Sequence, residues 1–345
     1  MSSAYIVTPN DLILVTGSNG FVGTSVVENL LARGCTRLRL FVRPSSKLEK
    51  LKAILAQYPA GKTAEIISGD LLSREDCQAA AKDVAVIIHL AAGFEKSFAG
   101  AFMNSALATR NLIEAFLESG QPKRFVNVSS FAVYSNWGME RGALLDESCP
   151  LETASQERND AYGFGKLQQE KIVRDYGVKK NLPFVILRPG AVYGPGKPDL
   201  SGRVGINTFG FFIHLGGGNE LPLTFVDNCA EAIVLAALKP GVDGETFNVV
   251  DDETMSSRDF LAARKSAKKF FSVWIPYRLA YLGSVLWENY SKKSGGQLPP
   301  VFNRRRCAAE WQGNTFTNQK LRDRLGWKQK IPLADALKSF LAQYK

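Results

Sequence analysis

Tyr162 and Lys166 have the residue types and the spacing that suit proton transfer. The apolar spacing of residues 160–176 predicts a helix, and residues four positions apart on a helix project from one face. An unperturbed tyrosine has a pKa near ~10, and an ammonium group held beside it favours the phenolate. The pair is therefore a candidate for acid/base catalysis, and the alternative is an ordinary helix surface with a solvated lysine.

A hydroxyl that could assist this pair follows a second apolar segment. Residues 124–128 predict a parallel strand, and Ser129 and Ser130 come directly after it. Open α/β sheets bind their ligands outside the carboxyl ends of their strands. Ser130 is therefore the candidate partner of Tyr162, and the alternative is a helix cap or a turn.

A glycine-rich turn lies near the start of the chain, between a predicted strand and a predicted helix. Residues 11–16 form an apolar run typical of a buried parallel strand, and the helical pattern after the turn ends at Gly34. Gly17 allows a tight turn, Gly20 lets the backbone approach a pyrophosphate, and Gly23 permits close helix packing. Because the helix N-terminus would face the negative charge, this segment predicts a dinucleotide site.

The second predicted strand, at 37–42, ends directly before Arg43, and Lys47 follows four residues later. At this position NAD enzymes place an acid against the ribose 2′-hydroxyl, whereas arginine accommodates a 2′-phosphate. Arg43 therefore favours NADP(H), with NAD(H) as the alternative cofactor. The alternative role for Arg43 is a solvated side chain at the end of a strand.

Two further strands bring small and acidic residues to the same edge of the sheet. A third strand at 66–70 ends in Asp70, which is placed to touch the adenine, and a fourth is predicted at 84–90. The fourth strand leads into Ala91 and Ala92, whose small side chains let the backbone pass close to a cofactor. His89 lies inside the apolar run, so we expect a buried core histidine rather than a ligand.

Composition and charge narrow the class of protein. The chain has 345 residues, a formal net charge of +10 and five widely separated cysteines without the spacing of a zinc site. No apolar run approaches the ~18 to 20 residues of a membrane span, so we expect a cytoplasmic protein. The cysteine spacing leads us to expect reduced thiols and no metal site. The basic charge fits an anionic ligand, but the absence of a nucleic-acid-binding motif argues against DNA or RNA.

Taken in order, these motifs resemble the extended short-chain dehydrogenase/reductase superfamily, which contains sugar-nucleotide epimerases and dehydratases, dihydroflavonol reductases and 3β-hydroxysteroid dehydrogenases. The resemblance covers nearly the whole chain. It rests on Thr16-Gly-Ser-Asn-Gly-Phe-Val-Gly23, Gly69-Asp70-Leu71, His89-Leu-Ala-Ala92, Ser129-Ser130, Tyr162 with Lys166, Leu187-Arg-Pro-Gly-Ala-Val-Tyr-Gly-Pro-Gly196, Phe225-Val-Asp-Asn-Cys-Ala-Glu-Ala232 and Leu325-Gly-Trp-Lys328.

The resemblance implies roles for individual residues. Tyr162 would be the catalytic acid/base, Lys166 would bond the nicotinamide ribose and lower the pKa of the tyrosine, and Ser130 would orient the reacting oxygen. Asp70 would bond the adenine amino group. The cofactor-binding set expected from the motifs is Gly17, Asn19, Gly20, Phe21, Val22, Gly23, Arg43, Lys47, Asp70, Leu71, Ala91, Ala92, Tyr162, Lys166 and Pro189.

The implied fold is α/β, with a Rossmann-type doubly wound parallel sheet and a smaller, discontinuous C-terminal substrate domain. Residues 1–190 would form the NAD(P)-binding domain with a further strand near 245–250, and residues 191–244 and 251–345 would mainly bind substrate. The implied function is an NAD(P)-dependent oxidoreductase that transfers hydride to or from a ketone or secondary alcohol. The alternatives are a sugar-nucleotide epimerase or dehydratase that retains its cofactor, and a nucleotide-binding protein without catalysis.

Two positions depart from the pattern of the superfamily. Many relatives carry a proton-relay asparagine in the helix after the fourth strand, predicted here at 101–117, where the alignment gives Ser105 and places Asn104 one residue earlier. Sugar-nucleotide relatives often have an arginine that grips the diphosphate where this chain has Leu221. The second departure argues against a sugar-nucleotide substrate, although Arg203 or the arginines at 304–306 could bind phosphate instead.

The second half of the chain contains two apolar segments with more than one interpretation. Residues 204–215 either line a pocket with aromatic side chains that include Phe209 or form a plain core helix. Residues 265–294 are basic and aromatic, and we expect a lid over the active site, with a peripheral membrane contact as the alternative. The partner is a small-molecule substrate, and a homodimer remains open.

Overall fold

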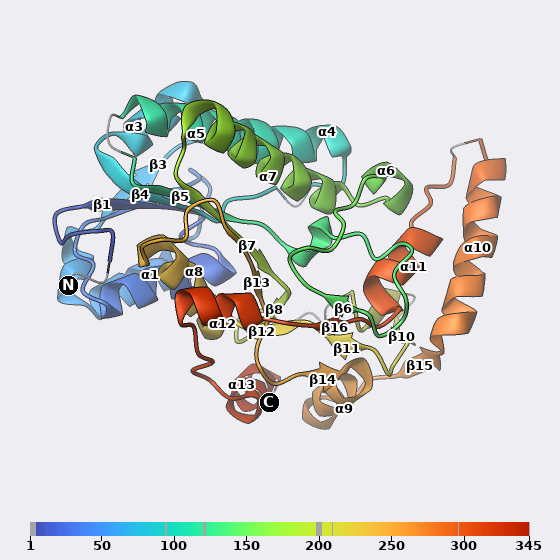
Figure 1. Ribbon diagram of the computed structural model, residues 1–345. Helices are drawn as coiled ribbons and strands as arrows, with labels where there is room; N and C mark the ends of the chain where they lie inside the picture. The colour runs from blue at the N-terminus through green and yellow to red at the C-terminus, as the bar shows by residue number, and fades with distance from the viewer. Residues whose placement is uncertain are drawn as a thin grey trace.

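Seven parallel strands form the central sheet of the protein (Figure 1). The computed structural model describes residues 5–93, 95–119, 122–197, 202–208, 210–295 and 297–344. Within these residues the sheet has the order β13-β7-β5-β4-β1-β2-β3, and this confirms the predicted Rossmann-type fold. Its strands are β1 (Leu12–Thr16), β2 (Leu38–Val42), β3 (Glu65–Ser68), β4 (Val84–His89), β5 (Arg124–Val128), β7 (Phe184–Pro189) and β13 (Thr246–Val249).

The central strands are apolar because both faces of the sheet are covered. Alternate residues of β1 enter opposite cores: Ile13 and Val15 lie in one cluster, and Leu12 and Leu14 lie in the other. Figure 1 shows α3, α5 and α7 over one face and α1 and α8 over the other. These helices are α1 (Phe21–Ala32), α3 (Arg74–Ala81), α5 (Ala108–Glu118), α7 (Ala161–Lys180) and α8 (Val226–Leu238).

The last strand of the sheet comes from a distant part of the chain. β13 pairs in parallel with β7, as predicted for residues 245–250, after more than fifty intervening residues. Shorter elements fill the connections in the first half. They are α2 (Glu49–Ala56), a 3₁₀ turn (Pro59–Thr63), α4 (Phe98–Ala101), a π-helical segment (Phe102–Leu107), a 3₁₀ turn (Phe131–Val133), β6 (Leu144–Leu145) and α6 (Ser155–Arg158).

The second half of the chain builds small sheets beside the central one. The core helix considered for residues 204–215 is wrong, because β9 and β10 form an antiparallel pair there and β15 extends it; Phe209 lies outside the described residues. The small strands are β8 (Ala191–Tyr193), β9 (Gly205–Thr208), β10 (Phe211–Leu215), β11 (Glu220–Leu221), β12 (Leu223–Phe225), β14 (Met255–Ser256), β15 (Ser272–Ile275) and β16 (Thr315–Phe316).

Five helices complete this half, and Figure 1 shows α10 at the outer edge of the molecule beside α11. They are α9 (Ser257–Ala267), α10 (Tyr277–Lys293), α11 (Arg304–Trp311), α12 (Gln319–Leu325) and α13 (Leu333–Ala342). Within the described residues, no helix combines the length and the apolarity that a bilayer-spanning segment requires. All five cysteines are free thiols.

His89 lies in a buried polar cluster beneath the carboxyl edge of the sheet, as predicted. Its Nδ1 lies 2.7 Å from Oγ1 of Thr16, and its Nε2 lies 3.0 Å from Oγ1 of Thr109. Gln169 of α7 donates to the same Thr109 hydroxyl. Burial lowers the pKa of His89 to about 3, so the ring is neutral and holds β1, β4, α5 and α7 together.

Candidate active site

The glycine turn between β1 and α1 has the close backbone packing of a phosphate-binding loop. Gly17 has a φ of +68°, which favours glycine. A Cβ on Gly23 would lie 2.0 Å from the carbonyl oxygen of Gly17, so no larger residue fits without moving the loop. The first turn of α1 has no side-chain cap and no acidic residue, so its N–H groups face the cavity with the positive end of the helix dipole. These features fit the pyrophosphate of a dinucleotide.

Replacing Gly23 with alanine should weaken nicotinamide nucleotide binding by about five- to more than one-hundred-fold. Overpacking strain of about 1 to 3 kcal/mol has this size, and here it falls on the loop that cradles the phosphates. Gly283→Ala is the control, because a Cβ there would meet its nearest neighbour, Phe302, at an ordinary 3.5 Å. Fluorescence titration with NADPH measures both variants. Unchanged affinity in Gly23→Ala would contradict the assignment of the loop.

A cavity of about 1660 Å³ lies along the carboxyl edge of the sheet and receives all the predicted site residues. Arg43 and Lys47 line the cavity beyond the end of β2, while Pro189 lines it at the end of β7. Asp70 lines it just beyond β3 and accepts a hydrogen bond from the backbone N–H of Leu72. The structure therefore brings together Gly17, Asn19, Gly20, Phe21, Val22, Gly23, Arg43, Lys47, Asp70, Leu71, Ala91, Ala92, Ser130, Tyr162, Lys166 and Pro189.

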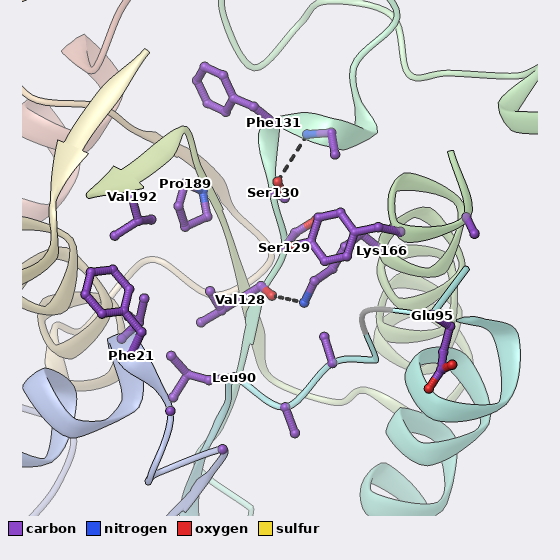
Figure 2. Close-up of a pocket in the computed structure, with 18 of the residues that line it drawn as sticks. Phe21, Leu90, Glu95, Val128, Ser129, Ser130, Phe131, Lys166, Pro189 and Val192 are labelled. Carbon is purple, nitrogen blue, oxygen red and sulfur yellow. Dashed lines mark hydrogen bonds between the residues drawn. The ribbon is translucent and has the colours of Figure 1, made fainter. Parts of the chain in front are cut away.

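The three predicted catalytic side chains meet at the wall formed by the end of β5 and the start of α7. Asp160 caps α7 by accepting a hydrogen bond from Gly163 N–H at 2.7 Å, which fixes the helix start just before Tyr162. Tyr162 is hydrogen-bonded to Ser130, and Nζ of Lys166 donates to the carbonyl oxygen of Val128 at 2.7 Å. Figure 2 shows Ser129, Ser130 and Lys166 around this wall, with Phe21 and Leu90 across the cavity.

Burial controls the electrostatics of this wall. Burial raises the pKa of Tyr162 to about 12, although the hydrogen bond with Ser130 acts to lower it. Burial also lowers the pKa of Lys166 to about 7, although the negative charge of Glu170 acts to raise it. The role of Lys166 in lowering the pKa of the tyrosine stays a prediction, because in the protein alone its ammonium bonds the carbonyl oxygen of Val128.

A buried ion pair between Glu170 and Arg188 lies behind the wall and was not identified from the sequence. Glu170, one turn after Lys166 on α7, accepts two hydrogen bonds from Arg188 of β7, at 2.9 and 2.7 Å. Arg188 also donates to the hydroxyl of Tyr134, which donates to Asn248 of β13. The pair ties α7 to β7 and, through Tyr134, to the edge strand β13, so it holds Lys166 in place. A glutamate four residues after the lysine, on the same helix face, is the signal that could have identified it.

The two residues considered for the proton relay both lie in the π-helical segment 102–107. A π-helix contains an extra residue in its turn, which changes the facing of the side chains that follow. Asn104 lines the cavity and donates to Glu95 at 2.9 Å. Ser105 is buried instead, where it packs closely against Gly165 of α7. Sequence alignment alone does not detect the extra residue. No sequence motif indicated that Glu95 would accept a hydrogen bond from Asn104.

The parallel sheet, the glycine turn and the tyrosine–lysine wall together define a dinucleotide-binding α/β enzyme. Residues 13–249 match the model of the NAD dependent epimerase/dehydratase family. The chain belongs to this family, within the extended short-chain dehydrogenase/reductase superfamily. The prediction of an enzyme in this superfamily is thereby confirmed.

Similar proteins include both dehydrogenases and epimerases. The chain is 26% identical to the mouse sterol-4-alpha-carboxylate 3-dehydrogenase, decarboxylating, over 94% of this chain and 88% of that protein. It is also 26% identical to the 3-beta-hydroxysteroid dehydrogenase of Mycolicibacterium neoaurum, over 96% of this chain and 91% of that protein. The UDP-glucuronic acid 4-epimerase of Bacillus cereus, in complex with UDP-glucuronic acid and NAD, shares the fold with a TM-score of 0.72, 21% identity and coverage of 96% and 98%.

Proposed function

We propose that the protein is an NADP-preferring oxidoreductase that acts on a ketone or secondary alcohol of a fairly apolar small molecule. The convergence of Ser130, Tyr162 and Lys166 on the cavity that the glycine turn enters carries this proposal. The nicotinamide, when bound, supplies or accepts the hydride. Tyr162 gives or takes the proton of the reacting oxygen, Ser130 orients that oxygen, and Lys166 binds the nicotinamide ribose.

Arg43 and Lys47 support the preference for NADP(H). Both side chains are exposed at the cavity edge beyond β2, where the 2′-position of an adenosine ribose would lie in this family of folds. Among the residues that the structure describes, none forms an ion pair with Arg43 or Lys47, so both cations are available to a 2′-phosphate. NAD(H) is the alternative cofactor.

The substrate side of the cavity supports an apolar substrate. Leu223, Phe260 and Val301 line it, whereas Leu221 is fully buried in the core and cannot reach a diphosphate. Two similar proteins are named for a sterol-4-alpha-carboxylate and a 3-beta-hydroxysteroid as their substrates. We therefore place the substrate class near hydroxysteroids and other cyclic secondary alcohols.

A sugar-nucleotide epimerase or dehydratase is the second candidate. Arg158, Arg203 and Arg306 line the cavity, and guanidinium groups suit a diphosphate or a carboxylate. Nicotinamide that stays bound through purification would support this candidate. Exchangeable NADP(H), with turnover of a hydroxysteroid or cyclic ketone and none of UDP-glucose, would support the oxidoreductase.

The remaining expectations concern organisation. We propose that residues 191–244 and 251–345 mainly bind substrate while residues 1–190 and β13 hold the cofactor, because the cavity lies between these two sets. The intact acid/base residues give no support to a non-catalytic protein. A homodimer and a cytoplasmic location stay predictions, which light scattering and cell fractionation would test.

The affinity for NADPH should fall as the pH rises above about 7. The pKa of Lys166 is lowered to about 7, so the free protein loses this ammonium above that pH, whereas the proposed ribose contact favours the charged form. A proton must then be taken up on binding, which weakens affinity by up to about tenfold per pH unit. Titrations between pH 6.5 and 9 should show this slope in the wild type and not in Lys166→Met. Identical slopes in both would remove Lys166 from the nucleotide site.

A further inference from the structure

Helix α10 presents an apolar stripe to solvent. Leu279, Leu282, Leu286 and Tyr290 follow one another at helical spacing, and each is 55 to 63% exposed. The opposite side of the helix is buried through small residues such as Ala280 and Ser284, and Figure 1 shows α11 on that side. The stripe is therefore a second apolar face, separate from the one that anchors the helix to the protein.

The strand before this helix carries further exposed apolar side chains. β15 is an edge strand of its small sheet, and it leads into α10 through Pro276. Phe271, directly before β15, is 71% exposed, and Trp274 within it is 53% exposed. We call Phe271, Trp274 and the α10 stripe together the α10 surface. Figure 1 shows β15 and α10 at the same edge of the molecule, and exposed apolar side chains on neighbouring elements indicate an interaction site.

The charge of this region is strongly positive. Residues 265–294 contain six basic side chains, Lys265, Lys268, Lys269, Arg278, Lys292 and Lys293, and one acidic side chain, Glu288. Glu288 is paired with Arg304 at 2.9 Å and with Lys292 at 2.9 Å, so its charge is neutralised. The region therefore carries a surplus of positive charge beside its leucines, which matches a partner whose interior is apolar and whose surface is anionic.

The same region does not form the lid expected over the active site. No residue of 265–294 lines the main cavity, whereas Pro299, Val301 and Arg306, which follow α10 in the chain, do. Trp287 donates to the carbonyl of Pro299, and the hydroxyl of Ser291 donates to that of Leu298. These bonds tie α10 to the cavity rim, so a partner that binds to α10 also lies near the cavity.

We propose that the α10 surface docks the enzyme on an anionic lipid bilayer, with α10 parallel to the membrane plane. Its leucines and Tyr290 enter the headgroup and acyl boundary, while Lys292 and Lys293 contact lipid phosphates. The docked enzyme then receives an apolar substrate from the bilayer through the rim at 299–306. This last step rests on the proposed substrate class, but the docking itself does not.

Vesicle co-sedimentation of the full chain tests the docking. Wild type should bind phosphatidylcholine vesicles that contain phosphatidylserine, bind pure phosphatidylcholine vesicles more weakly, and be released by salt. Leu282→Gln/Leu286→Gln should lower the partition coefficient by about tenfold or more for each leucine. Val178→Gln on α7 is the matched control, because Val178 is 85% exposed and distant from α10 in sequence.

A second pair of variants tests the charge. Lys292→Gln/Lys293→Gln should lower the partition coefficient about fivefold per lysine, whereas Lys179→Gln/Lys180→Gln at the end of α7 should not. NADPH titration and far-ultraviolet circular dichroism confirm that each variant is folded. Loss of NADPH binding by the wild type would count against the proposed function and not against docking.

Three outcomes would overturn the docking proposal. The first is a wild type that does not bind the anionic vesicles. The second is equal binding by wild type and Leu282→Gln/Leu286→Gln. The third is a concentration-dependent dimer that the leucine variants dissociate while vesicles bind nothing, because the partner of the α10 surface would then be a second copy of the chain.

Discussion

Tyr162→Phe should lower kcat by about 10²- to 10⁴-fold and leave the affinity for nicotinamide nucleotide nearly unchanged, the usual scale for a lost acid/base group. The substitution removes one hydroxyl, and the ring keeps its place on α7. That hydroxyl is hydrogen-bonded to Ser130, and burial holds its pKa at about 12, so it is protonated at neutral pH and ready to donate. Steady-state oxidation of NADPH with a cyclic ketone, beside a nucleotide titration, measures both quantities.

Tyr176→Phe on the same helix is the matched control. Its hydroxyl donates to Glu114 at 2.6 Å and does not line the cavity, so turnover should be nearly unchanged. Near-normal activity of Tyr162→Phe would show that the proposed mechanism is wrong. Equal losses in both variants would show that the effect comes from the helix and not from the acid/base group.

Arg43→Ala should weaken NADPH binding by roughly ten- to more than a hundredfold and change NADH binding little. A guanidinium pairs bidentately with a 2′-phosphate, and a charge-assisted contact contributes about 1.5 to 3 kcal/mol. Calorimetric titration of both nucleotides gives the ratio. Arg37→Ala is the control, because Arg37 lies at the opposite end of β2 and donates to the carbonyl of Asn10.

The wild-type titrations decide this assignment even without the variant. Equal affinity for NADPH and NADH, or tighter binding of NADH, would show that Arg43 is a solvated side chain without a cofactor contact. Either result would strengthen the epimerase candidate. A moderate loss in Arg43→Ala remains compatible with the prediction, because Lys47 lines the same edge of the cavity and supplies part of the charge.

The sheet and the cofactor edge were predictable because their signals are local. Apolar runs of four to six residues are typical of strands buried on both faces, and the glycines of the turn stand at spacings that backbone packing requires. The residue roles implied by the superfamily agree with the geometry, since every expected residue lines one cavity. Those roles stay predictions until the variants are measured.

The errors arise where distant parts of the chain decide the outcome. Residues 204–215 are aromatic enough for a core helix, but β10 pairs with β15, about sixty residues away. The desolvation that raises the pKa of Tyr162 depends on the elements packed around α7, which a helix spacing cannot show. The extra residue of the π-helical segment likewise has no signature in the spacing of its side chains.

The late position of β13 in the chain has a consequence for how the protein can be divided. A fragment that ends at residue 190 would leave β7 with an unpaired edge, because its partner β13 is missing. It would also lack α8 and Trp327, which cover the face of the sheet that contains Ile13 and Val15. Such a fragment exposes apolar surface and strand edge together, the two features that promote aggregation. During synthesis the cofactor half therefore completes its core only after nearly the whole chain has emerged from the ribosome.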